Sequence, residues 1–265
     1  MVKEIKFLKK KFSDPFTVED LRSSLAEQRR ILELRKLYGS GLPEIKDINK
    51  RSFWNVIFAN QNNDRNDRMA NIRVREVIKI LKKKEGNVLD IGFGLCPIER
   101  KLLRKKTDKL HFFGIDISDF AVKQARERFS GTFLKASILK IPFSLNTFDI
   151  IIALEVLEHI PPRNTFKAFG EIRRVLKDNG LLVISVPLNE DLESLCRKGL
   201  NPSGHTREYT PCLIKAELEM AGFLTIEEKY FYAFRNMYWF KNLLQRTFFK
   251  NKWKPNNILL VAKKK

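Results

Sequence analysis

The sequence predicts an α/β protein built on a doubly wound, mostly parallel sheet of seven strands. From Asn87 onward, short apolar runs alternate with segments whose apolar residues recur at helical spacing, as they do when helices connect parallel strands. The expected strands are residues 87–91, 110–116, 132–135, 147–153, 181–186, 223–232 and 257–262. The expected helices are residues 69–84, 96–106, 118–129, 164–177 and 211–221.

A pair of glycines follows the first of these strands and predicts a ligand pocket. The strand ends in Asp90, and Gly92 and Gly94 then allow the backbone to turn sharply and to approach a ligand closely, because glycine has no Cβ. The helical pattern that follows would direct its N-terminal amides toward the same ligand. The next strand ends in Asp116, whose carboxylate suits the two hydroxyls of a ribose.

Two ligand classes use this geometry, and an ordinary tight strand-to-helix turn would also fit a glycine pair alone. Dinucleotide enzymes carry Gly-x-Gly-x-x-Gly, but Pro97 occupies the third glycine position here. The order Asp-x-Gly-x-Gly resembles instead the first motif of the class I S-adenosylmethionine (SAM) methyltransferases. Cys96 stands where that family usually has a third glycine. The resemblance implies that Asp90, Gly92 and Gly94 hold the methionine end of SAM.

Three later segments strengthen the resemblance. They are residues 137–143, residues 147–162, which contain Leu-Glu-Val-Leu-Glu-His-Ile-Pro-Pro, and residues 171–187. Together with the glycine motif, they resemble the small-molecule O-methyltransferases of ubiquinone biosynthesis over roughly residues 85 to 230. The resemblance implies a Rossmann-like methyltransferase fold.

The same resemblance implies how the cofactor would be held. Asp116 and Ile117 would lie at the ribose, and Ser137 and Ile138 at the adenine. The family usually has Asp at the position of Ser137.

The residues after the fourth strand are the candidates for chemistry, since the carboxyl ends of parallel strands form the ligand edge. His159 is the expected general base, because neutral imidazole accepts a proton near pH 7. Glu158 is the second expected catalytic residue, and Glu155 is expected to line the SAM pocket. An alternative for His159 is a positioning role at the turn formed by Pro161 and Pro162.

A metal site is a further hypothesis. The run Glu155-x-x-Glu158-His159 also resembles the metal-binding run of small-RNA 3′-end 2′-O-methyltransferases and of some quinone O-methyltransferases. Those enzymes add a later histidine, and His205 stands at a suitable place. Carboxylates and imidazoles suit Mg²⁺, Mn²⁺ or Zn²⁺. We expect SAM as the cofactor and treat a divalent metal as the less favoured addition, with its ligands left open.

The chain divides into two parts on these patterns. Residues 1–60 are expected to form an N-terminal helical extension with a helix over 17–38, and residues 61–265 the methyltransferase domain. In that domain, residues 87–186 form the core and residues 187–265 the acceptor side, which ends in a basic aromatic segment. An amphipathic helix near 236–249 fits a cover for the sheet edge, an acceptor lid or a membrane-surface element.

Charge suggests partners without fixing them. The net charge is +20, and ten Lys or Arg with no Asp or Glu follow Glu228. A basic aromatic surface suits an anionic membrane face or RNA, although the aromatic residues also fit an ordinary core. Three scattered cysteines, no secretory signal and no apolar run of spanning length are the pattern of a cytoplasmic basic protein, which this charge could bring to a membrane surface.

The sequence therefore predicts a SAM-dependent methyltransferase (EC 2.1.1). We expect O-methylation of a small or lipid-linked acceptor such as a surface sugar or a quinone precursor. An RNA methyltransferase and a catalytically idle SAM-binding partner subunit are the alternatives. An enzyme that uses NAD or a nucleotide sugar is less favoured because of Pro97. The oligomeric state stays open.

Overall fold

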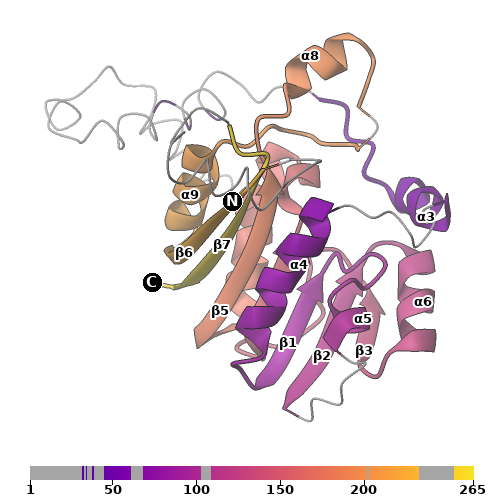
Figure 1. Cartoon of the computed structure of the whole chain (residues 1–265), viewed down its shortest axis with the longest axis vertical. Coiled ribbons are helices and arrows are strands. Elements are labelled where there is room, and N and C mark those ends of the chain that lie inside the picture. The colour runs from indigo at the N-terminus through magenta and orange to yellow at the C-terminus, as the bar shows by residue number, and fades with distance from the viewer. Residues whose placement is uncertain are drawn as a thin grey trace, which may run out of the picture.

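The computed structural model describes residues 32, 34, 38, 45–60, 68–102, 109–201, 203–232 and 254–265. Within them lies a 7-stranded sheet of order β3-β2-β1-β4-β5-β7-β6, which crosses the centre of the molecule in Figure 1. Neighbouring strands are parallel from β3 through β5, and β7 runs antiparallel to both β5 and β6. The predicted doubly wound, mostly parallel sheet is confirmed.

The element bounds follow the predicted alternation. The strands are β1 Gly86–Ile91, β2 Leu110–Asp116, β3 Thr132–Lys135, β4 Phe148–Leu154, β5 Leu176–Pro187, β6 Phe223–Phe231 and β7 Asn257–Lys264. The helices are α3 Arg51–Asn60, α4 Arg68–Leu81, α5 Glu99–Leu102, α6 Asp119–Arg128, α7 Thr165–Val175, α8 Leu192–Arg197 and α9 Pro211–Met220. Two 3-10 turns, η3 Leu157–His159 and η4 Pro162–Asn164, follow β4.

Three elements differ from the prediction. Strand β5 begins already at Leu176, because Leu176 pairs with Phe148 of β4, so the helix expected over 164–177 ends before it. The helix expected over 96–106 begins only at Glu99, because Cys96 has a φ of 54° and this left-handed conformation does not belong to an α-helix. Helix α8 is an addition that no sequence pattern indicates.

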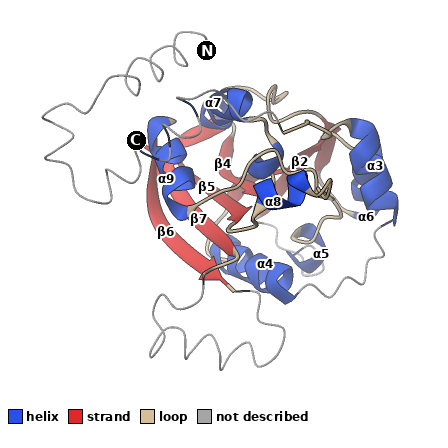
Figure 2. Cartoon of the chain, turned by 90° about the horizontal axis from the view of Figure 1, so that it is seen from above, coloured by secondary structure: helices blue, strands red, loops and turns tan. Residues whose placement is uncertain are grey.

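Side chains on opposite faces of the sheet enter two separate layers of core. In β4, Ile151 and Ala153 pack toward α7 and α9, whereas Ile150 and Ile152 pack toward α4 and α5. This alternation follows from the period of two in a strand, and continuous apolar runs such as Ile150 to Ala153 are expected when both faces are covered. Figure 2 shows the helices on both sides of the strands.

The parts outside the sheet gather near the carboxyl ends of the parallel strands. Helices α3 and α8 lie beyond these ends in Figure 1. Of the expected N-terminal extension, the described residues include α3 and the buried side chains of Leu34 and Tyr38. The expected helix at 236–249 lies outside the described residues. No helix in the described part of the chain is long and apolar enough to cross a bilayer.

Two glycines test how tightly the core is packed. An added Cβ on Gly114 of β2 would lie 2.6 Å from Phe93 Cδ1 and 2.7 Å from Phe133 Cδ1. Gly114→Ala should therefore lower the free energy of unfolding by about 1–3 kcal/mol. The control is Gly170→Ala in α7, where no atom lies within 4 Å of the added Cβ. It should raise stability by about 0.5–1 kcal/mol. Urea denaturation measures the free energy of unfolding of both variants. Equal changes in the two would contradict the close packing of Phe93 and Phe133 around Gly114.

Candidate active site

The glycine loop after β1 is pressed against its neighbours. Gly92 has a φ of 69° and Gly94 a φ of 51°, which is the left-handed region that glycine enters at little cost. A Cβ on Gly92 would lie 2.7 Å from Val156 Cγ2, and one on Gly94 would lie 3.2 Å from the ring of Phe58. Both residues are therefore glycine for conformation and for space, as the sequence analysis expects.

This loop lies where ligands bind in open α/β sheets. Strand β1 is flanked by β2 on one side and by β4 on the other, so the chain order reverses at β1. The crevice at the carboxyl ends of such strands is the usual ligand site. Val156, in the loop after β4, packs against the Gly92 loop, so the expected catalytic run lies directly beside the expected cofactor loop.

Asp116 fastens the glycine loop to the end of β2. Its Oδ2 accepts a hydrogen bond from the Gly94 amide at 3.0 Å, and its Oδ1 accepts one from the Ser118 amide at 2.8 Å. Burial raises the pKa of Asp116. Each carboxylate oxygen can accept more than one hydrogen bond, so the group can still receive ribose hydroxyls while it shapes the loop.

Asp90 shares its buried position with a second carboxyl group that the sequence analysis does not single out. Glu99 of α5 is fully buried beside Asp90, and the two carboxyl groups lie within hydrogen-bonding reach of each other, while no N–H or hydroxyl group of the described residues bonds the Glu99 oxygens. Burial raises the pKa of Glu99 to about 7. Burial and the charge of Glu99 raise the pKa of Asp90 well above its usual value. The base of the glycine loop is thus acidic, and no ion pair among the described residues involves Asp90 or Glu99.

The expected adenine and ribose residues lie at neighbouring strand ends. Ile117 directly follows β2, and Ser137 and Ile138 follow β3, which pairs with β2. Ile138 is buried in the core, and Ser137 accepts a hydrogen bond from the Leu139 amide at 3.2 Å. The Ser137 hydroxyl keeps its proton for donation. Their cofactor roles stay predictions.

Helix α3 covers the opening between the glycine loop and the catalytic run. Asn55 Oδ1 accepts from the Ser118 hydroxyl at 2.7 Å and from the Phe120 amide at 3.3 Å. The Trp54 ring meets the His159 imidazole edge-on, with centroids 4.7 Å apart and an interplanar angle of 85°. The half-buried rings of Trp54 and Phe58 therefore form one wall of the site.

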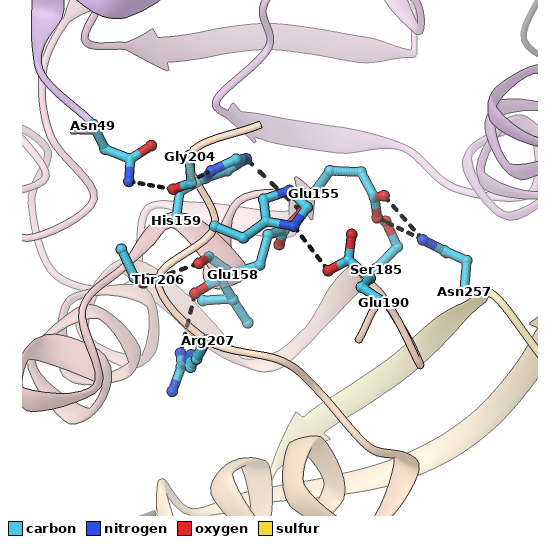
Figure 3. A network of polar contacts seen from close by, with 12 residues as sticks. Asn49, Glu155, Glu158, His159, Ser185, Glu190, Gly204, Thr206, Arg207 and Asn257 are labelled. Carbon is cyan, nitrogen blue, oxygen red and sulfur yellow. Dashed lines mark hydrogen bonds and ion pairs between the residues drawn. The ribbon is translucent and has the colours of Figure 1, made fainter. Parts of the chain in front are cut away.

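Glu158, His159 and His205 converge at the other wall. One ligand atom from each lies within 4.8 Å of the others, which makes them a group that could hold a metal ion. His205 Nδ1 lies 2.8 Å from Glu190 Oε2, and His159 Nδ1 lies 3.5 Å from the Gly204 carbonyl oxygen. Both partners accept hydrogen bonds, so each Nδ1 donates its proton to its partner. Figure 3 shows Glu158, His159 and Glu190 placed around this group.

Burial governs the charges in this group. It lowers the pKa of His159 to about 3, with His205 as a second cause, so the His159 imidazole is neutral. Burial and the charge of Glu155 raise the pKa of Glu158 well above its usual value. Neither Glu158 oxygen has a hydrogen-bond partner among the described residues. A neutral imidazole binds a cation directly, and a carboxyl group with a raised pKa binds one by releasing its proton.

Glu155 is engaged elsewhere, although it belongs to the same run. Its φ of 56° turns its side chain toward β5 and β7. There it accepts from the Ser185 hydroxyl at 2.7 Å and from Asn257 Nδ2 at 2.9 Å, and Arg73 Nη1 lies 3.4 Å away. The metal hypothesis grouped Glu155 with the other three residues, but the structure brings together Glu158, His159 and His205 without it.

Comparison with known proteins bears on the domain and the fold. Residues 88–180 match the family described as "Methyltransferase domain". An uncharacterized protein of Methanocaldococcus jannaschii is 37% identical over 43% of this chain and 45% of its own length. The sterol 24-C-methyltransferase ERG6B of Gibberella zeae is 32% identical over 40% of this chain and 30% of its own length. A SAM-dependent methyltransferase from Archaeoglobus fulgidus has a similar structure, with a TM-score of 0.55 and 20% identity over 75% of this chain and 94% of that chain.

Residues 88–180 thus match a methyltransferase domain, and the fold of the described residues is similar to that of a solved SAM-dependent methyltransferase. The chain spans less than half the length of the two curated relatives. The sequence resemblance to this class is thus confirmed, and the acceptor is a matter of proposal.

Three residues of the site escape the sequence analysis. Glu190 follows the end of β5, so its place at the ligand edge of the sheet was the available signal. Glu99 belongs to no motif, and its burial follows from the late start of α5. Trp54 lies in an amphipathic helix, where an aromatic residue gives no sign of which partner it will contact.

Asp116→Asn tests the role of the carboxylate at the cofactor loop. The amide has one acceptor oxygen for the two backbone donors, so affinity for S-adenosylhomocysteine should fall about 10-fold or more. Calorimetric titration measures this. The control is Asp149→Asn near the start of β4, since Asp149 also accepts from a backbone amide, that of Asn87 at 2.8 Å, but lies far from the ligand edge. An unchanged affinity in Asp116→Asn would show that the carboxylate does not shape the cofactor site.

Proposed function

We propose that this chain transfers the methyl group of SAM to a hydroxyl of a small or lipid-linked acceptor. The observation that carries the proposal is the group formed by Glu158, His159 and His205 beside the glycine loop. It offers lone pairs to a hydroxyl or a cation at the place where the cofactor's methyl group would enter.

The cofactor would lie along the carboxyl edge of the sheet. In this proposal Asp90, Gly92 and Gly94 bind the methionine end, where the acidic floor complements the ammonium and the sulfonium. Asp116 and Ile117 bind the ribose, and Ser137 and Ile138 bind the adenine. The glycine loop is already held in its conformation by the Asp116 bond to Gly94, so little ordering is needed on binding.

Methyl transfer requires an in-line displacement at carbon. The acceptor oxygen forms a bond to the methyl carbon while the bond from carbon to sulfur breaks, and the sulfonium becomes a neutral thioether. The acceptor proton must leave the oxygen. The protein contributes by aligning the acceptor with the methyl group and by receiving that proton or easing its departure.

His159 can serve in one of two ways. Without a metal, its Nε2 would accept the acceptor proton, as the sequence analysis expects. With a metal, Nε2 would be a ligand together with Glu158 and His205. A divalent cation there would lower the pKa of a bound hydroxyl. The pKa of about 3 makes His159 a weak proton acceptor, because an efficient general base has a pKa near the working pH. This favours the ligand role.

Glu190 would support the same site from outside. Its carboxylate accepts a hydrogen bond from Nδ1 of His205 and would hold the His205 ring in place beside Glu158. A carboxylate behind a histidine ligand commonly orients the ring and raises its basicity. Trp54 closes the opposite side of His159 and limits the access of water.

Titration with S-adenosylhomocysteine, with NAD as the control, tests the cofactor. We expect binding of S-adenosylhomocysteine alone, because the pocket lacks the third glycine of the dinucleotide motif. An acceptor screen with labelled SAM, run with and without EDTA, then tests the transfer. Binding without transfer to any hydroxyl-bearing acceptor would favour a SAM-binding partner subunit. Binding of NAD alone would overturn the proposal.

The two glutamates of the run allow a matched test of the metal. Glu158→Gln should weaken Mn²⁺ binding by about 10-fold or more, because it removes a charged ligand. Glu155→Gln should weaken Mn²⁺ binding much less, because Glu155 is bonded to Ser185 and Asn257 and would act on the ion only through its charge. Calorimetric titration of the EDTA-treated protein with Mn²⁺ measures both. Equal effects of the two variants, or no Mn²⁺ binding to the unaltered protein, would remove the metal from the proposal.

A further inference from the structure

A buried arginine lies two residues after His205 and touches none of the groups assigned to the cofactor. Arg207 is 1% exposed, and its ion-pair partner Glu217 of α9 is 0% exposed. Arg207 Nη1 donates to Glu217 Oε1 at 2.7 Å and to Thr165 Oγ1 at 2.7 Å. Its guanidinium carbon lies 4.5 Å from the centre of the Tyr209 ring.

The other branch of Arg207 reaches the catalytic turn. Arg207 Nη2 donates to the Leu157 carbonyl oxygen at 3.1 Å. The preceding residue, Thr206, donates to the Glu158 carbonyl oxygen from its amide at 2.8 Å and from its hydroxyl at 3.0 Å. Three donors of the segment 204–207 therefore hold the backbone of η3, from which Glu158 and His159 project (Figure 3).

Glu217 is fixed in turn by two tyrosines. Tyr38 donates to its Oε1 at 2.7 Å, and Tyr209 donates to its Oε2 at 3.0 Å. Elements far apart in the sequence thus meet at one carboxylate and one guanidinium. Arg207 is contacted from four parts of the chain: the N-terminal extension, α7, α9 and the catalytic turn. These contacts together hold its guanidinium in one position.

The cost of burying the Arg207–Glu217 ion pair indicates that the cluster fixes a geometry rather than adding stability. Burying an ion pair costs several kcal/mol of desolvation per ion, and an apolar cluster of the same volume is often as stable or more so. A guanidinium has directional donors, which an apolar side chain lacks. The bonds to Leu157 and Thr165 use that directionality to fix one part of the chain relative to another.

We propose that Arg207, fixed by Glu217, is a positioning residue that sets His205 against Glu158 and His159. The two imidazole centroids lie 4.8 Å apart, and each ring projects from a segment that Arg207 or Thr206 joins. The catalytic importance of that spacing rests on the proposed function. The spacing itself can be measured without cofactor or acceptor.

The chain offers a direct readout, since it has only three histidines, His111, His159 and His205. Their imidazole ¹⁵N and ¹H signals can be assigned in a long-range correlation spectrum of the full chain. Arg207→Lys keeps the positive charge but loses the second branch. It should shift the signals of His159 and His205, leave those of His111 unchanged, and leave affinity for S-adenosylhomocysteine unchanged. It should also weaken Mn²⁺ binding about 10-fold if the metal site is present.

Arg174→Lys is the matched control. Arg174 also pairs with a glutamate, Glu171, and also holds two carbonyl oxygens, those of Ile141 and Phe143 at 2.7 Å each, but it does so away from the imidazoles. This variant should lower the melting temperature without moving the His159 and His205 signals. A folded Arg207→Lys protein with both signals unchanged would overturn the proposal, as would equal shifts in the Arg174→Lys protein.

A second variant covers the case in which Arg207→Lys does not fold. Glu217→Gln keeps the shape and the acceptor oxygen but removes the negative charge that holds Arg207, and it should shift the same two signals. Unchanged signals in the folded Glu217→Gln protein would also overturn the proposal. A failure of the unaltered protein to bind S-adenosylhomocysteine would instead count against the proposed function, since the spectrum is recorded without cofactor.

Discussion

The site depends on one contact between two loops, that of Val156 with Gly92. Parallel pairing of β1 with β4 brings the ends of these strands to the same edge, and the register from Val88–Ile150 to Ile91–Ala153 sets how far each loop extends. A Cβ at Gly92 would collide with Val156, so the loops can approach this closely only with glycine there. The cofactor loop and the catalytic turn become neighbours through that approach, and each later feature of the site is built on it.

The electrostatics of this edge form a second constraint. Asp90 and Glu99 lie on the cofactor side and Glu158 on the catalytic side, and all three are buried carboxyl groups with raised pKa values. Burial of such groups without a cation costs stability. A ligand that brings positive charge recovers part of that cost on binding. SAM carries a sulfonium and an ammonium, so the acidic floor under the glycine loop fits a cationic cofactor better than the anionic pyrophosphate of a dinucleotide.

The sequence predicts the sheet well because strand periodicity and burial on both faces leave strong patterns. It places the end of β5 well but not its start, since Leu176 looks like the last turn of a helix until its pairing with Phe148 is known. It also predicts a longer helix after the glycine loop, because nothing in the pattern reveals the left-handed conformation at Cys96. Local propensity decides such boundaries only where tertiary contacts agree with it.

The residues of the candidate site also differ in how far the sequence predicts them. Residues at or just beyond the end of a strand, such as Asp90, Asp116 and His159, are predicted from spacing in the sequence. Arg207 is joined to the site by contacts made across the fold, so spacing in the sequence does not indicate it. Glu155 stands in the sequence motif, but its carboxylate bonds to Ser185 and Asn257 and not to the group around His159. A linear motif indicates which residues are near the site, but packing decides which of them face it.

Residues that precede the sheet make direct contacts with the candidate site. Tyr38 completes the buried cluster around Arg207, Asn49 donates to the Gly204 carbonyl oxygen at 2.7 Å, and Trp54 packs on His159. Gly204 directly precedes His205, so Asn49 holds the backbone next to a candidate ligand. The three contacts come from a stretch of chain that the sheet does not need for its own pairing. Two of these contacts, those of Asn49 and Trp54, reach the segments that carry His205 and His159, so residues before the sheet help to fix the surroundings of the two imidazoles.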